Sequence, residues 1–200
     1  MDREELFRKL SIENEGKMVL LVLDGLGGLP VKGRTELETA RTPNLDLLAS
    51  ESELGLSHPI APGITPGSGP AHLSLFGYDP LQYEIGRGIL EALGVGVEVG
   101  PRSVAVRGNF ATLENGLVTD RRAGRIASEK NREIITFLRG KIRKIEDVEI
   151  GLYPGEEHRF VLVLTGEGLS DQLSDADPEA VGRPILHARA KSEAAAKTTR

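Results

Sequence analysis

Apolar and polar positions in the first part of the chain predict a strand followed by a helix. Residues 17–23 form an apolar run between a charged segment and Asp24-Gly25, which is typical of a fully buried strand in a mostly parallel sheet. Functional residues of such sheets gather at the carboxyl ends of the strands. Thr42 then suits a helix cap and Pro43 the first helical position, with an apolar face over residues 45–49. We therefore expect a β-loop-α beginning and an α/β fold class.

The next feature is a loop that ends at a serine between two glycines. Residues 57–70 contain four prolines and three glycines and lead to Ser68 and the apolar stretch 71–76. Ser68 is therefore expected near a helix N-terminus. Backbone N–H groups at such an end face an anion, so this hydroxyl stands where a phosphoryl group could be cradled.

Beyond residue 86 the pattern changes to that of an antiparallel α+β unit. Asn115-Gly116 is typical of a tight hairpin turn, because both residues tolerate positive φ angles. The other expected elements are a helix over 89–93, strand-like alternation over 95–99 and 104–113, a helix over 128–138 capped by Ser128, strands over 148–153 and 159–164, and the start of a helix after residue 188. This unit is expected to be inserted after the first one, which has too few strands to close a sheet.

Composition limits the classes of function. The chain has no cysteine, so metal ligands must be carboxylate, imidazole or hydroxyl groups, and hard cations are favoured. A net charge of −5 gives no general attraction to nucleic acid or to anionic lipid. The charged residues 1–16 do not resemble a signal peptide, so a cytoplasmic location is the default expectation, with no membrane partner.

Asp24 and Ser68 are the candidates for chemistry in the first unit. A strand-end aspartate can hold a metal ion, and a metal ion lowers the pKa of a bound hydroxyl until it becomes a nucleophile. The alternatives are that Asp24 only stabilises the turn after it and that Ser68 is a turn or cap residue. His72 would share a helix face with Ser68, either anchoring the helix or holding a metal ligand in place. Thr65 is a rival hydroxyl without flanking glycines.

Arginines are the candidates in the second unit. The segment 120–125 carries Arg121, Arg122 and Arg125 after Asp120, and guanidinium groups suit bidentate binding of phosphate or carboxylate. A solvated loop with a salt bridge to Asp120 is the alternative. Further anion contacts are expected from one strand residue and one adjacent pair, namely Arg107, His158 and Arg159. Three aspartates in the loop 171–177 could hold a cation, although capping of the loop is favoured.

Several motifs, in order along the chain, resemble one family. They are Val22-Leu23-Asp24-Gly25, the segments 40–46 (ARTPNLD) and 65–80 (TPGSGPAHLSLFGYDP), Arg107-Gly108-Asn109-Phe110, and the segment 120–125 (DRRAGR). Together they resemble the archaeal-type cofactor-independent, or 2,3-bisphosphoglycerate-independent, phosphoglycerate mutases of the alkaline phosphatase superfamily. The resemblance runs through most of the chain.

This resemblance implies a fold and a mechanism. The fold would be part of an alkaline-phosphatase-like, mostly parallel sheet with an inserted smaller α+β domain. Residues 1–94 would be the N-terminal part of a metal-binding catalytic domain, 95–188 the inserted substrate-binding domain, and 189–200 the start of the return. Asp24 and Ser68 would bind one ion of a site for two divalent metal ions, Mn²⁺, Mg²⁺ or Zn²⁺. Ser68 would become phosphorylated while 3-phosphoglycerate and 2-phosphoglycerate interconvert in glycolysis and gluconeogenesis, and the arginines would hold this small-molecule substrate.

The chain also departs from the family pattern. Family members carry further aspartate and histidine ligands in a C-terminal half, and none of the four histidines here supplies that set. We therefore expect an N-terminal portion that is inactive alone. The alternatives are a related phosphomutase or phosphatase of the superfamily, which would use the same Asp24 and Ser68, and a non-catalytic truncated binding protein. Assembly into a homo-oligomer is compatible with each.

Overall fold

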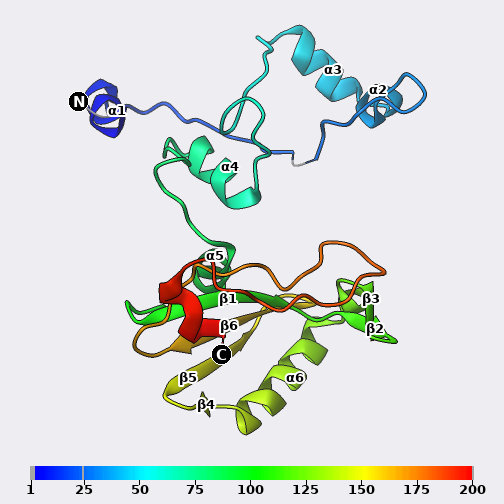
Figure 1. The fold of residues 1–200 in the computed structure, drawn as a ribbon. Coiled ribbons are helices and arrows are strands. Elements are labelled where there is room, and N and C mark those ends of the chain that lie inside the picture. Colours follow the sequence, from blue (N-terminus) through cyan, green and yellow to red (C-terminus); the bar gives the residue numbers. More distant parts are fainter. Residues whose placement is uncertain (1–2, 24, 200) are drawn as a thin grey trace.

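The computed structural model describes residues 3–23 and 25–199 (Figure 1). It has two differently built parts. The first part, up to residue 86, consists of short helices joined by long loops: α1 (Arg3–Leu10), α2 (Glu36–Thr39), α3 (Pro43–Ser50) and α4 (Ser68–Leu75). The second part contains the strands and the remaining helices: α5 (Arg87–Gly94), β1 (Ser103–Asn109), β2 (Thr112–Glu114), β3 (Leu117–Asp120), η1 (Ala123–Arg125), α6 (Ser128–Lys141), β4 (Lys144–Ile145), β5 (Val148–Pro154), β6 (Arg159–Thr165) and η2 (Glu193–Thr199).

The second part is built on a four-stranded antiparallel sheet in the order β1-β6-β5-β4. In the register of the central strands, Val161 lies opposite both Arg107 of β1 and Tyr153 of β5. Gly108 lies opposite Phe160, whose ring fills the space that a side chain at Gly108 would need. β2 and β3 form a separate hairpin that follows β1 in the chain. The end of β1, the end of β5 and the beginning of β6 lie together at one edge of the sheet.

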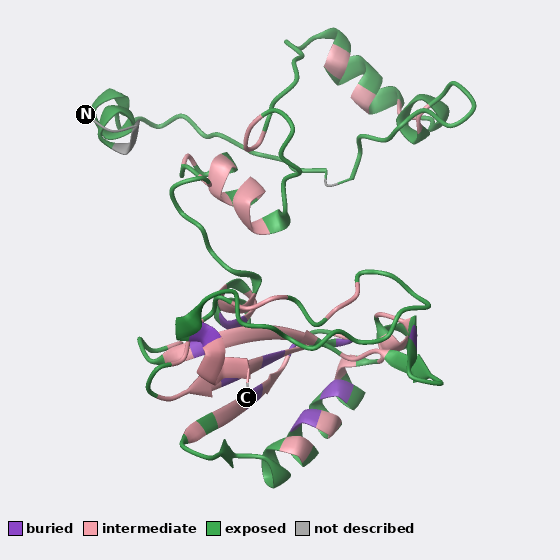
Figure 2. Cartoon of the chain, in the orientation of Figure 1, coloured by how far each residue is buried: buried purple, intermediate pink, exposed green. Residues whose placement is uncertain are grey.

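The main cluster of buried residues lies on one face of this sheet. Ala92 of α5 is buried against Val161 and Val163 of β6, and Val97 completes the cluster. α6 packs on β5, and Ile135 of α6 is buried. The chain end returns to the sheet through η2, in which Ala195 is buried. Figure 2 shows that the buried residues are confined to this part of the molecule.

The first part has no buried residue among the described residues from 5 to 86. The strand expected over residues 17–23 is absent from the structure, because no described segment runs beside it to pair with its backbone. Its apolar side chains face solvent, with Met18 96% and Val19 90% exposed. The structure is thus a mixed α/β fold whose four-stranded sheet is antiparallel, and no described strands pair in parallel.

Elements specified by local chemistry match the prediction. α3 begins at Pro43 after the N-cap residue Thr42, whose side chain forms no capping hydrogen bond, and α4 begins at Ser68. The β2–β3 turn has φ angles of 52° at Asn115 and 79° at Gly116, as a hairpin of this type requires. The strands expected over 148–153 and 159–164 are β5 and β6.

Two local predictions are wrong, and a third is refined by the structure. Residues 95–99 form no strand, although Val97 and Val99 pack against the core as their alternation predicted. Ser128 does not cap α6, because it is already the first helical residue. The chain end forms a 3₁₀ helix, η2, where the beginning of a helix was expected. Among the described helices, none is long and apolar enough to cross a membrane.

Candidate functional site: a serine at a helix N-terminus and an arginine-rich sheet edge

Ser68 is the first residue of α4, after the extended residue Gly67. It is exposed, and its hydroxyl forms no hydrogen bond with the described part of the chain. His72, one turn later, lies with Nδ1 2.6 Å from the Ser68 carbonyl oxygen and so ties the first turn of the helix together. A side chain at Gly69 would meet Leu90 of α5 at 2.5 Å, so this end of α4 lies against α5. Ser68 is therefore a free hydroxyl at a helix N-terminus.

Only one of the two predicted metal ligands, Ser68, lies in the described part of the chain. Asp24 lies outside the described residues. Among the residues that are described, no three histidine, aspartate or glutamate side chains gather in a way that could hold a metal ion. His72 uses Nδ1 on the backbone of its own helix, which fits the expectation that it anchors this turn. The described side chains alone do not form a metal centre.

Arg107 and Arg159 lie on one face of the sheet, where β1 ends and β6 begins. Arg107 is opposite Val161, and Arg159 is two residues before Val161 on the same strand. Both side chains therefore project from the face of the sheet that α5 covers. Arg159 Nη1 is 3.9 Å from Glu91 Oε2 of α5. Burial, reinforced by the charges of Arg87 and Arg159, lowers the pKa of Arg107 below its ordinary value. This edge therefore concentrates positive charge.

The turn after β3 carries the other predicted arginines. Asp120 shapes it, since its carboxylate accepts hydrogen bonds from the backbone N–H groups of Arg122, at 2.7 Å, and Gly124, at 2.6 Å. These bonds lower the pKa of Asp120. Asp120 thus acts on the backbone of the turn, and its carboxylate forms no salt bridge with a described arginine.

Arg121 and Arg125 have protein partners. Arg121 binds Asp177 in a bidentate pair, with distances of 2.9 Å from Nε and 2.7 Å from Nη2. Arg125 Nη1 lies 2.8 Å from Glu157 Oε2. Asp177 also accepts a bond from the N–H of Glu179, which supports the loop-capping role over cation binding. Arg121 therefore joins the loop 171–179 to this edge, and the Nε and Nη2 side of its guanidinium group is occupied by Asp177.

His158 is buried, at 4% exposed, in the turn between β5 and β6. Its Nδ1 atom has no hydrogen-bond partner among the described residues. Burial, together with repulsion from Arg159, Arg122 and Arg125, lowers its pKa, so the neutral ring is favoured. A neutral imidazole can donate its ring N–H in a hydrogen bond to an anion.

Comparison with known proteins places this geometry in a family. A family model described as 2,3-bisphosphoglycerate-independent phosphoglycerate mutase matches residues 49–200. The chain belongs to this family. A protein of Thermotoga petrophila named as a probable 2,3-bisphosphoglycerate-independent phosphoglycerate mutase is 58% identical over 199 residues, which are 100% of this chain and 50% of the relative. The chain thus spans about half the length of the curated relatives it matches.

Solved structures agree with the family assignment. A cofactor-independent phosphoglycerate mutase from Thermoplasma acidophilum is 38% identical with a TM-score of 0.54, over 64% of this chain and 34% of that one. A protein from Pyrococcus horikoshii is 40% identical with a TM-score of 0.56, over 72% of this chain and 35% of that one. The fold of the phosphoglycerate mutase family is therefore shared over most of this chain.

In this member of the phosphoglycerate mutase family, the structure brings most of the predicted substrate-binding residues together at one edge of the sheet. The charges of Arg122, Arg125 and Arg159 all act on His158, and the charge of Arg107 acts on Asp177. Two residues of this edge were missed by sequence reasoning. Arg87 stands between two glycines, a signal that could have found it, whereas Asn131 of α6 carries no such signal.

Asn131 is fully buried and holds the turn that carries His158 and Arg159. Its Nδ2 atom donates to the carbonyl oxygens of Glu157, at 2.7 Å, and Arg159, at 2.5 Å. Ser128 assists, because its hydroxyl accepts from the N–H of Glu157 at 2.9 Å and donates to Glu156. The first turns of α6 thus fix the edge of the sheet.

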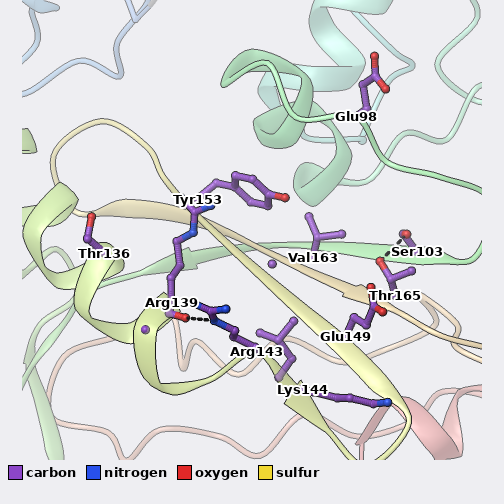
Figure 3. Close-up of a pocket in the computed structure, with 13 residues that line it drawn as sticks. Glu98, Ser103, Thr136, Arg139, Arg143, Lys144, Glu149, Tyr153, Val163 and Thr165 are labelled. Atoms are coloured by element: carbon purple, nitrogen blue, oxygen red, sulfur yellow. Dashed lines mark hydrogen bonds between the residues drawn. The ribbon is translucent and has the colours of Figure 1, made fainter.

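A cavity of about 920 Å³ lies elsewhere on the same face (Figure 3). Tyr153 and Val163 point into it, and the guanidinium group of Arg139 lies 5.6 Å from the Tyr153 ring centre. None of the predicted site residues lines this cavity. The arginine-rich edge, rather than this groove, is therefore the candidate site.

Proposed function

We propose that the protein carrying this chain interconverts 3-phosphoglycerate and 2-phosphoglycerate through a phosphoserine at Ser68. The observation that carries the proposal is the unbonded hydroxyl of Ser68 at the start of α4. It stands between two glycines, so a phosphoryl group can approach it closely, and the N–H groups of the first turn face the incoming anion. The family of the chain supports the choice of substrate.

In the first step, the Ser68 oxygen attacks the phosphorus of 3-phosphoglycerate. The bond from phosphorus to the glycerate oxygen breaks, and that oxygen takes up a proton. Glycerate then reorients, its 2-hydroxyl attacks the phosphoserine, and the Ser68 oxygen leaves. Ser68 loses its hydroxyl proton when it attacks and regains a proton when it leaves, and the 2-hydroxyl group loses its proton in the second step, so atoms balance without any further reactant. The protein's task between the two steps is to keep glycerate bound, because each lost molecule ends the cycle.

The arginine-rich edge suits this task. We assign Arg107, Arg122 and Arg159 to the anionic groups of the substrate, with neutral His158 as a hydrogen-bonding neighbour. Arg121 and Arg125 were also expected to bind substrate. Their bonds to Asp177 and Glu157 favour a supporting role for Arg121, while Arg125 is half-exposed and can exchange its partner for a ligand.

We also propose that the active protein uses two divalent metal ions, with Asp24 and Ser68 as ligands of one of them. Bound metal ions would offset the charge on the transferring oxygens. The remaining ligands would come from the half of the relatives' length that this chain does not span. The same half would complete a mostly parallel sheet around residues 17–23, so that residues 1–94 form a catalytic domain and 95–188 an inserted one. On this account the 200 residues alone are inactive.

The test is an assay of the full polypeptide carrying this chain, with 3-phosphoglycerate and Mn²⁺. Wild type should form 2-phosphoglycerate, and Ser68→Ala should lower the rate by about a thousandfold or more. Thr65→Ala is the matched control, since Thr65 is the rival hydroxyl in the same loop, and it should retain activity.

Four outcomes contradict the proposal in different ways. Undiminished conversion by Ser68→Ala excludes this nucleophile, and loss of conversion only in Thr65→Ala assigns the rival. Release of inorganic phosphate without 2-phosphoglycerate indicates a phosphatase of the same superfamily. Binding of phosphoglycerate without either product indicates a non-catalytic protein.

A further inference from the structure

Arg87 occupies an unusual position at the start of α5. It is exposed and lies between Gly86, which caps the helix, and Gly88. A side chain at Gly88 would collide with the backbone carbonyl of Ala105 in β1. The first turn of α5 therefore lies directly on the backbone of β1, two residues before Arg107.

The same helix face carries Arg87 and Glu91. The two residues are four positions apart, so they lie one turn above each other. Glu91 lies 3.9 Å from Arg159, which shows that this face looks onto the beginning of β6. The charge of Arg87 also acts on Arg107. Arg87, Arg107 and Arg159 thus gather where α5, β1 and β6 meet.

The positive charge of this cluster is only partly balanced within the described part of the chain, since the charge of Asp175 acts on Arg107 without forming an ion pair with it. Glu91 approaches Arg159, whereas neither Arg87 nor Arg107 has an ion pair or a side-chain hydrogen bond with a described residue. Guanidinium groups that are held together without carboxylate partners repel one another, and a bound anion relieves this repulsion. The cluster is therefore preorganised for an anion.

We propose that Arg87 is a third guanidinium of the subsite formed with Arg107 and Arg159, and that this subsite binds the carboxylate of glycerate. The assignment rests on the proposed function. Because the phosphoryl group must reach Ser68, the anionic group left for the arginines gathered where α5, β1 and β6 meet is the carboxylate, which stays charged throughout the reaction. Arg87 then retains glycerate between the two phosphoryl transfers.

The experiment compares Arg87→Gln with wild type in the full polypeptide carrying this chain. The matched control is Arg102→Gln, because Arg102 is also exposed, directly precedes β1 and pairs with Glu167 at 2.7 Å. We expect Arg87→Gln to raise the KM for 3-phosphoglycerate and the inhibition constant of D-glycerate by about tenfold each, and Arg102→Gln to change neither. Arg87→Lys should recover part of the loss, since it keeps the charge without the planar fork.

A second readout separates retention of glycerate from mere structural support. When glycerate escapes, water attacks the phosphoserine and releases inorganic phosphate, so the ratio of phosphate to 2-phosphoglycerate should rise in Arg87→Gln. Inhibition by inorganic phosphate should stay unchanged, because phosphate binds elsewhere. Weakened inhibition by phosphate with unchanged inhibition by D-glycerate would overturn the carboxylate assignment.

Calorimetric titration with 3-phosphoglycerate makes the result independent of turnover. Equal affinities of wild type and Arg87→Gln overturn the role of Arg87, even where wild type is an active mutase. A weakened affinity of Arg87→Gln supports it, even where the mutase assay shows no product and the proposed function fails.

Discussion

At the scale of the residue, His158 is the side chain whose surroundings most clearly control its chemistry. It is buried in the β5–β6 turn, with Arg159, Arg122 and Arg125 raising the local potential and Glu157 and Asp120 opposing them. The neutral ring is therefore the folded form. A neutral histidine beside arginines can contact an anionic substrate without adding a further charge that must be desolvated.

Stability should therefore fall as the pH falls below the ordinary pKa of histidine. The folded pKa of His158 lies below its ordinary value of 6.5, so the unfolded chain takes up the proton first. The loss begins as the pH falls through 6.5 and is complete only below the folded pKa. Urea unfolding from pH 8 to pH 5, roughly the range in which histidine changes charge, should show a shallower pH dependence for His158→Gln than for wild type. His58→Gln, at an exposed histidine, is the control, and an equal change of slope in both variants would refute the explanation.

At the scale of the element, the packing of α5 on β1 decides where Arg87 and Glu91 stand. Gly88 permits this close approach, because the Ala105 carbonyl occupies the space that a side chain at position 88 would need. Gly94, at the other end of the helix, has open space where a Cβ atom would stand, and its φ angle is not positive. The two glycines of one helix thus have different reasons for being glycine.

Gly88→Ala should destabilise the protein by about 1–3 kcal/mol, because backbone must move to admit the methyl group. Gly94→Ala should leave the free energy of unfolding unchanged or raise it slightly. Urea unfolding measures both. A Gly88→Ala variant as stable as Gly94→Ala would show that α5 does not lie on β1 as described.

Elements also differ in how far their sequence specifies them. The Asn115-Gly116 turn, the Thr42-Pro43 helix start and the helix at Ser68 were predictable, because their determinants are neighbours in the chain. The clamp of Asn131 on the β5–β6 turn joins residues 24 to 28 positions apart, and no local pattern reveals it. The same limit applies to the bidentate pair of Arg121 with Asp177. Residue types of the site were therefore predictable, while their partners were not.

At the scale of the whole molecule, the two parts differ in what they bury. The sheet with α5, α6 and η2 encloses a core, whereas the apolar run at residues 18–23 faces solvent, with exposed fractions between 46% and 96%. A run of this composition is typical of a strand buried on both faces. The family assignment, with about half of the relatives' length spanned, supports the proposal that it pairs within a longer polypeptide.

Hydrogen exchange tests this pairing. The backbone amides of residues 18–23 should exchange rapidly in the 200-residue chain and slowly in the full polypeptide, because ladder hydrogen bonds protect amides. The amides of β6 provide the internal control and should be protected in both. Equally rapid exchange of residues 18–23 in the two proteins would contradict a sheet built around this run.

In the proposed reaction, Ser68 carries the phosphoryl group between the two transfers. The most direct measurement is acid quenching of the full polypeptide during turnover of 3-phosphoglycerate, followed by mass spectrometry of its peptides. We expect a phosphate on Ser68 in wild type and no phosphate at this position in Ser68→Ala. Phosphate on a residue other than Ser68 would contradict this role. So would a Ser68 that stays unphosphorylated while isotope label exchanges rapidly between the two phosphoglycerates.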